Sequence, residues 1–279
     1  ACTAPRSELD TAALRSAEIV GIEDAPVLLQ DGAWEGDPYV KGGAARPRIG
    51  LVEEFEIRGE FIEPGREDVA VLLWHSTGGT GTRLWLVVLT PGPERPQTLA
   101  ASLIGDRVQV IHFSYVDEQI RLEIIAHGPQ DAACCPGQFE RRNFRFVGDD
   151  LVGFTEIVGR ASTRDRGGEV WQLERLQLGD EEPVSIEVTM EFDRLGNVFG
   201  ESGCNSYAGT VANSDGRNIE MSVGATSARR CPEDQAEMQA QFLRRLKAAE
   251  RYSFQNGRLV LQYALEEGAD AMSFVSLRP

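Results

Sequence analysis

The apolar residues of this 279-residue chain occur in short runs separated by glycine and proline. Between positions 47 and 160 the runs lie at 51–57, 69–74, 84–89, 107–113, 120–126, 143–147 and 151–158. Turn sequences such as Pro91-Gly92-Pro93 separate them. Short runs at this spacing are typical of a mostly antiparallel sheet or sandwich. We therefore predict a β-rich domain for this part of the chain.

The remainder of the chain mixes strands with a single helix. We expect strands at 170–176, 184–192, 197–199, 219–223, 259–263 and 272–277, and the run 184–192 alternates without a break. A helix is predicted at 232–250, because Met238, Phe242, Leu246 and Ala249 fall on one face. Pro232 suits its first turn. This part is predicted to be α+β, with the helix packed on an antiparallel sheet.

The polar stretch 160–168 has two glycines and no apolar anchor, which favours a linker or a long loop. Residues 1–20 are either a short helix capped near Ser7 and running to about residue 19, or an irregular lead-in. The predicted organisation is a lead-in or tether at 1–20, a β-rich domain at 21–160, a linker at 161–168 and a second domain at 169–279. The fold class is α+β and predominantly β.

The chain carries 44 acidic and 28 basic residues, a net charge of −16. Such a surface repels phosphate backbones and anionic lipid headgroups, which argues against nucleic-acid binding and polybasic membrane docking. The apolar runs also fall short of the roughly 18–20 residues that a membrane-spanning helix needs. We predict no nucleic-acid partner and no transmembrane segment.

The cysteines lie at Cys2, Cys134, Cys135, Cys204 and Cys231. Four in the body of the chain and one near its start fit two disulfides and a lipid-bearing Cys2 in an oxidising compartment. Buried, reduced thiols in a cytoplasmic protein are the alternative. Cys2 is either the residue after a lipoprotein cleavage site or a cysteine beside an arbitrary chain boundary. The cysteines lack zinc-ligand spacing, and neither a metal nor a cofactor is predicted.

The segment 199–209 carries a specific pattern of glycines around a Cys-Asn pair. It contains Gly203, Cys204, Asn205, Tyr207 and Gly209, and Thr226, Cys231-Pro232-Glu233, the helix and two strands follow in order. This series resembles the META/HslJ family throughout residues 168–279. The resemblance implies an antiparallel sheet or partial barrel with one helix.

Within this motif, Gly203 and Gly209 bracket a tight path that a Cβ would hinder, while Asn205 can bond turn amides. Cys204 and Cys231 are a candidate disulfide if the start of the helix lies against this turn. A reduced, buried pair is the alternative.

The first half resembles, in stretches 42–47, 69–82, 103–110 and 127–136, the N-terminal region of bacterial envelope lipoproteins that carry a META domain. Relatives of this kind often have an acidic, glycine-rich loop similar to a calcium site. Here Ile62 and Pro64 stand where ligands would fall, so no metal site is predicted. The resemblance implies a periplasmic or outer-membrane lipoprotein, exported by a signal peptide that is not in this chain.

Catalytic patterns are weak. The run 78–82 lacks the Gly-Lys-Ser/Thr of a phosphate loop and fits a hairpin turn. His75-Ser76 has no nucleophile elbow around it. His127 with Cys134 or Cys135 could form a nucleophilic pair, although adjacent cysteines in an oxidising compartment are normally oxidised. No catalytic residue is predicted, and a non-enzymatic role is favoured.

Trp34 and Tyr39 lie in a loop of Gly, Pro and Asp, where they form an exposed binding contact or fold back over the sheet edge. The favoured hypothesis is a monomeric, non-catalytic envelope protein with a binding or envelope-stress role, whose partner is an unknown envelope protein or a small ligand. The alternatives are a Cys/His-dependent hydrolase, and a protein-partner or inhibitor module that uses a sheet edge or the loop 30–46.

Overall fold

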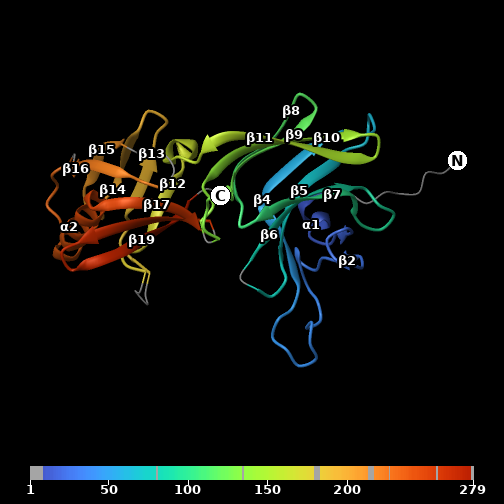
Figure 1. Ribbon diagram of the computed structural model, residues 1–279, viewed down its shortest axis with the longest axis horizontal. Helices are drawn as coiled ribbons and strands as arrows, with labels where there is room; N and C mark the ends of the chain where they lie inside the picture. Colours follow the sequence, from blue (N-terminus) through green and yellow to red (C-terminus); the bar gives the residue numbers. More distant parts are fainter. Residues whose placement is uncertain are drawn as a thin grey trace. The chain divides into compact units, whose positions relative to one another are not determined.

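A computed structural model describes residues 9–79, 81–133, 135–178, 183–212, 217–225, 227–255 and 257–277. The chain forms two compact units (Figure 1). The first comprises the chain up to Ala126 together with Glu140–Val158, and the second comprises His127–Phe139 together with the chain from Gly159 onward. Both are predominantly β, as predicted. Within the described ranges, no helix is long and apolar enough to cross a membrane.

The N-terminal unit contains a seven-stranded sheet in the order β2-β1-β7-β6-β5-β4-β3. Its strands are β1 (Glu18–Ile19), β2 (Val27–Leu28), β3 (Ala33–Glu35), β4 (Arg48–Gly59), β5 (Asp68–Ser76), β6 (Arg83–Thr90) and β7 (Gln97–Asp106). Neighbouring strands are antiparallel except for β1, which meets β7 in parallel.

A second sheet of the same unit has the order β11-β10-β9-β8. Its strands are β8 (Gln109–Val116), β9 (Gln119–Ala126), β10 (Gln138–Val147) and β11 (Asp150–Arg160). One core cluster joins the two sheets, with Leu72 and Leu86 of the first sheet packed with Leu122 of the second. A separate cluster covers the other face of the first sheet. Because β5 is buried on both faces, its sequence is a continuous apolar run rather than an alternating one.

The start of the described chain differs from the predicted helix. Helix α1 (Thr11–Leu14) is a single turn, and the Asp10 carboxylate caps it by accepting a hydrogen bond from the Ala13 amide at 2.7 Å. The predicted cap, Ser7, lies outside the described residues. The helix ends early because Glu18 and Ile19 pair with β2 and β7 instead. Leu14 and Ile19 are then fully buried against the first sheet.

The C-terminal unit is one eight-stranded sheet in the order β16-β15-β14-β13-β12-β19-β18-β17. Its strands are β12 (Val170–Arg175), β13 (Thr189–Phe192), β14 (Asn197–Glu201), β15 (Ser206–Ala212), β16 (Glu220–Ala225), β17 (Ala249–Gln255), β18 (Arg258–Leu265) and β19 (Gly268–Ser276). Hydrogen bonds join its two ends, since the Ile219 amide donates to Glu250 O at 3.0 Å and the Tyr252 amide donates to Arg217 O at 2.9 Å. The sheet therefore curls into the predicted partial barrel.

Helix α2 (Glu233–Lys247), drawn in orange-red in Figure 1, lies against β16 and β18. Phe242 and Leu246 are fully buried, as their spacing predicted. Acidic residues stand in its first turn and basic residues in its last, which suits the helix dipole. Ala249, expected on the helix, begins β17 instead.

Several strands differ from the sequence-based expectation. Strands β7, β15 and β17 were not expected, because their sequences contain few large apolar residues or many small ones. Conversely, the alternating run 184–192 is a strand only from Thr189. Before it, Val188 makes an isolated bridge to Ser202, and the Val184 amide donates to Glu174 O at 2.8 Å. The chain bends there because its partners lie on different strands.

The segment expected to be a linker is a capped turn, the 3-10 helix η1 (Thr163–Arg166). Ser162 and Asp165 form a reciprocal capping box, and Thr163 is buried. Arg166 is buried in an ion pair with Glu169, and its guanidinium lies 5.2 Å from the ring centre of Trp171 and 5.6 Å from that of Phe254. The polar segment is therefore anchored by the guanidinium of Arg166, which packs against two aromatic rings.

Residues 127–139 group with the C-terminal unit through Asp131. Its buried carboxylate accepts hydrogen bonds from the amides of Gly128 and Gly137, each at 2.8 Å, and from Arg160 at 2.7 Å. Arg217, which lies just before β16, donates to the same carboxylate at 3.2 Å. The domain limits drawn from the sequence, 21–160 and 169–279, remain a proposal.

Candidate functional site

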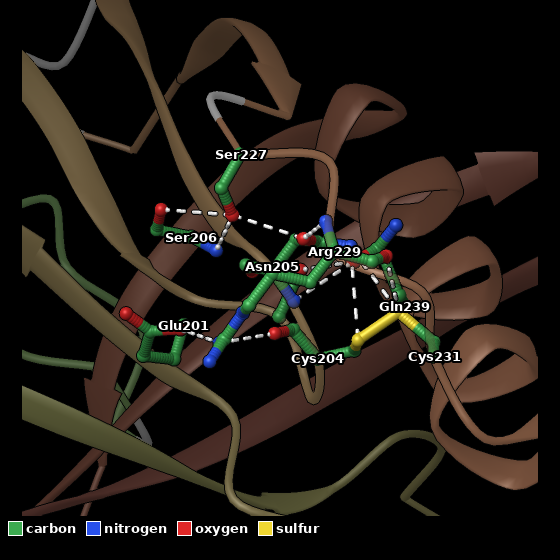
Figure 2. The surroundings of a disulfide bond; sticks show 9 residues. Glu201, Cys204, Asn205, Ser206, Ser227, Arg229, Cys231 and Gln239 are labelled. Atoms are coloured by element: carbon green, nitrogen blue, oxygen red, sulfur yellow. Dashed lines mark hydrogen bonds and ion pairs between the residues drawn. A yellow bond between two sulfur atoms is a disulfide. The ribbon is translucent and has the colours of Figure 1, made fainter.

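A disulfide joins two sequence motifs of the C-terminal unit (Figure 2). Cys204 lies in the turn between β14 and β15, and Cys231 lies immediately before α2. The two Cα atoms are 5.9 Å apart, a normal separation for a disulfide. Cys204 is buried and Cys231 is half-buried. The start of the helix therefore does lie against the turn, which is the condition under which this pair was expected to bond.

The side chain of Asn205 fills the space beside the disulfide and is 4% exposed. Its Oδ1 accepts hydrogen bonds from Ser227 Oγ at 2.9 Å and from the Arg229 amide at 2.7 Å. Its Nδ2 lies 3.2 Å from Cys231 Sγ. Its main-chain amide donates to Gln239 Oε1, on α2, at 3.1 Å. One asparagine thus connects the β14–β15 turn, the segment before the helix, and the helix itself (Figure 2).

The glycines of the motif stand where side chains would collide. Gly203 has φ of +100°, a conformation that favours glycine, and a Cβ there would lie 3.1 Å from Ile186 Cγ2. A Cβ on Gly209 would lie 2.0 Å from the carbonyl oxygen of Ser222. β15 and β16 can therefore approach as they do only with glycine at position 209.

Tyr207 is almost completely buried, and its hydroxyl donates to Thr189 O at 3.0 Å. Its ring meets Phe242 edge-on, with 5.5 Å between the ring centres. Burial raises the pKa of the Tyr207 hydroxyl well above its usual value. This hydroxyl is a neutral donor that ties β15 to β13.

A shallow pocket of about 410 Å³ lies beside the disulfide. Its rim mixes charges, with Glu187 and Glu201 facing Arg229 and Arg230. Arg229 is engaged within the motif, because its Nη2 donates to Cys204 O at 2.5 Å and lies 4.0 Å from the Glu201 carboxylate. The polar groups at this site bond mainly to one another, and the arrangement holds the turn and the helix together.

The motif and the barrel agree with a comparison to known families. Residues 165–277 match the model of the META domain. This part of the chain is a META domain. A solved structure, the NMR structure of the protein from Burkholderia xenovorans, is 21% identical over 42% of this chain and 87% of its own, with a TM-score of 0.33. No curated protein matches the chain.

Outside the META domain, binding contacts were proposed at Trp34 and Tyr39. These two aromatic residues lie in different environments. Trp34, on β3, is half-buried against the core of the N-terminal unit and lines a groove of about 700 Å³. Tyr39 is 57% exposed in the loop between β3 and β4 and is not among the residues of that groove. Three groove residues, Glu35, Arg48 and Trp74, were not singled out from the sequence. Their proximity depends on strand register, which no pattern in the sequence indicates.

The cysteine pair near His127 offers no thiolate at Cys135, which is disulfide-bonded. Cys134, the candidate lipidation site Cys2 and the motif residue Thr226 lie outside the described residues. A nucleophile at Cys135 would first require reduction of that bond.

The other histidine candidate, His75, does not pair with the serine beside it. His75 is buried, and its Nε2 lies 2.7 Å from Glu23 Oε1. Ser76 follows it on the same strand and therefore points to the opposite face of the sheet. The two cannot form a Ser-His pair. Among the residues that the structure describes, no cluster of three or more His, Cys, Asp or Glu side chains could hold a metal ion.

Proposed function

We propose that this chain is a non-catalytic protein of the bacterial cell envelope, whose META domain is a disulfide-bonded support and whose N-terminal unit carries the binding surface. The observation that carries the proposal is the Cys204–Cys231 disulfide, which the buried Asn205 side chain contacts. The META domain and the disulfide indicate an extracytoplasmic protein, since structural disulfides persist in oxidising compartments. A periplasmic or lipid-anchored location, and a role in binding or in envelope stress, are the finer parts of the proposal.

The state of the thiols tests the compartment. Cells that express the full-length protein with its own export signal are quenched in acid, and free thiols are labelled with a maleimide that adds visible mass. We expect Cys204 and Cys231 to be unlabelled without reductant and labelled after reduction. A Cys204→Ser variant should expose one additional thiol, which serves as the positive control. Labelling of both native residues without reductant would contradict an oxidising location.

The anchor is tested separately by mass spectrometry of the native amino terminus. Lipidation predicts a diacylglycerol-modified Cys2 as the first residue of the mature protein. An unmodified peptide that reads through residues upstream of Cys2 rules out the anchor, while the thiol assay continues to report on the compartment. For the envelope-stress role, a deletion strain should lose viability under envelope-active antibiotics and regain it with the wild-type gene.

A second candidate function, a protein-partner module, is favoured by the tip of the β3–β4 loop. Tyr39 and Val40 are adjacent apolar residues, 57% and 72% exposed. The loop that presents them is ordered by backbone hydrogen bonds, from Gly36 N to Pro47 O at 2.9 Å and from Gly43 N to Val40 O at 2.8 Å. An apolar tip held in this way suits insertion into a partner's pocket.

Site-specific photocrosslinking in intact cells tests this candidate. A crosslinker at Val40 should capture a discrete envelope protein. The matched control is a crosslinker at Leu195, an apolar META-domain residue that is 84% exposed. Equal capture from both positions, or capture from neither, would contradict a specific partner at the loop.

A further inference from the structure

The β3 edge of the seven-stranded sheet carries a built surface around Trp74. Strand register places Ala33 of β3, Gly50 of β4 and Trp74 of β5 in one row. Glu35 and Arg48 are paired two residues along the same strands. Because paired residues, and residues two apart on one strand, share a face, all five lie on one side of the sheet at its edge.

The indole of Trp74 lies flat across β4. A Cβ at Gly50 would be only 2.3 Å from the indole Cε2 and 2.4 Å from Nε1, so the ring occupies the space that a side chain would fill. Beyond Gly50, toward the edge, Ala33 contributes only a methyl group and is exposed. One face of the indole therefore rests on the backbone, and a shallow floor continues from the ring to the sheet edge. Trp74 is half-buried and lines the groove of about 700 Å³.

The two charged residues that line this groove, Glu35 and Arg48, carry opposite charges. Arg48 Nε lies 2.7 Å from Glu35 Oε2, and Arg46 Nε, outside the groove lining, lies 3.5 Å from Glu35 Oε1. The side chains of Glu35 and Arg48 are 44% and 58% exposed, so both retain hydrogen-bonding capacity toward solvent. Gln30 adds an amide, which can both donate and accept. The groove thus combines an aromatic floor with donors and acceptors that already neutralise one another.

This chemistry selects among ligand classes. An anion would face Glu35, a cation would face Arg48, and an alkyl chain would desolvate the ion pair without replacing its hydrogen bonds. A sugar ring fits each requirement, because its C–H face is apolar while its edge carries hydroxyls that donate and accept. Resting on the proposed function, in which the N-terminal unit binds, we infer that the Trp74 groove binds a pyranose ring of a neutral glycan.

Binding is tested on the full-length protein with neutral oligosaccharides, namely chitotetraose, cellotetraose and maltotetraose. Saturation-transfer NMR identifies the protons that contact the protein, and isothermal calorimetry measures Kd. We expect at least one of the three to bind, with its ring C–H protons receiving the strongest transfer. Trp74→Ala should weaken binding by about tenfold or more, since it removes the stacking surface.

Two further variants separate binding from folding. Ala33→Glu changes an exposed residue of the groove floor and should abolish binding while the thermal midpoint stays unchanged. Leu103→Ala, at an exposed residue of β7 that does not line the groove, should bind as the wild type does. If none of the three sugars binds, or if binding survives both Trp74→Ala and Ala33→Glu, the inference is wrong. The thiol and crosslinking assays would be unaffected by that result, so the failure of this inference is distinguishable from failure of the proposed function.

Discussion

The side-chain nitrogen of Asn205 lies 3.2 Å from the Sγ atom of Cys231, although the two residues are separated by a turn, two strands and a loop. The same side chain accepts two further hydrogen bonds from the segment that precedes Cys231. The disulfide and the asparagine are therefore two connections between the same pair of segments. Each should contribute measurably to the stability of the META domain.

Asn205→Ala is expected to destabilise the META domain by about 3 kcal/mol, because it leaves the Arg229 amide and the Ser227 hydroxyl without their buried acceptor. Hydrogen exchange of peptides from β14, β15 and α2 during urea unfolding reports on this domain alone. Asn197→Ala, an exposed asparagine of the same domain with a side-chain bond to Asp193, is the control and should cost less than about 1 kcal/mol. Equal costs for the two variants would contradict the role given to Asn205.

Replacing both Cys204 and Cys231 by alanine should cost about 3–4 kcal/mol, the loop-closure value for a separation of 27 residues. The free energy of unfolding is measured with and without reductant. Reductant should lower the stability of the wild type by a similar amount and leave the META-domain stability of the double variant unchanged. A wild-type domain whose unfolding midpoint does not respond to full reduction would exclude this contribution.

Gly209→Ala is expected to cost about 3 kcal/mol, because its Cβ would fall 2.0 Å from Ser222 O and force β15 away from β16. Gly224→Ala is a matched control on the neighbouring strand, where a Cβ would have no atom within 4 Å. It should change stability by less than about 0.5 kcal/mol. Thermal midpoints of the two variants, measured side by side, test whether the glycine of the motif is required by steric contact.

The buried carboxylate of Asp131 should make the stability of the C-terminal unit sensitive to acid. Burial alone would raise its pKa, but hydrogen bonds from Gly128, Arg160 and Gly137 outweigh burial and bring the pKa below the ordinary 3.8. Since the folded pKa is depressed, the charged form contributes stability above pH 3.8 that is lost as pH falls through the folded pKa. Asp131→Asn should therefore be less stable than wild type at pH 7, and the difference should shrink below pH 3.8.

Thermal midpoints across pH 2–8 check this expectation, with the exposed Asp149→Asn as control. The control should follow the wild-type curve throughout. A constant difference between Asp131→Asn and wild type over the whole range would mean that the loss is steric and not electrostatic.

Local patterns were sufficient to predict much of the fold. The helix spacing of Phe242 and Leu246, and the apolar run of β5, each depend on burial along one element, which periodicity records directly. The META motif was identifiable because glycine, cysteine and asparagine are each required at a fixed position. The same motif contains Cys204 and Cys231, which were therefore a candidate disulfide pair.

What the sequence did not predict depends on contacts between distant segments. Arg166 looks like a solvated linker residue until its guanidinium is seen against the rings of Trp171 and Phe254. Trp74 looks like a core residue until register sets it over Gly50, at an edge. In both cases the contacting residue is of a type that occurs in many structural settings, so its presence in the sequence does not indicate the contact.

Residues 127–139 belong to the C-terminal unit although the chain before and after them belongs to the N-terminal unit. This has a practical consequence for the design of gene fragments. The chain passes between its two units after Ala126, after Phe139 and after Val158, so the C-terminal unit is not one continuous stretch. A truncated gene that begins at residue 165, where the family match starts, would encode Arg217 but not the Asp131 carboxylate that it contacts. The transferable module is therefore larger than the segment by which it is recognised, and a fusion or transplant would need to include the stretch beginning at His127.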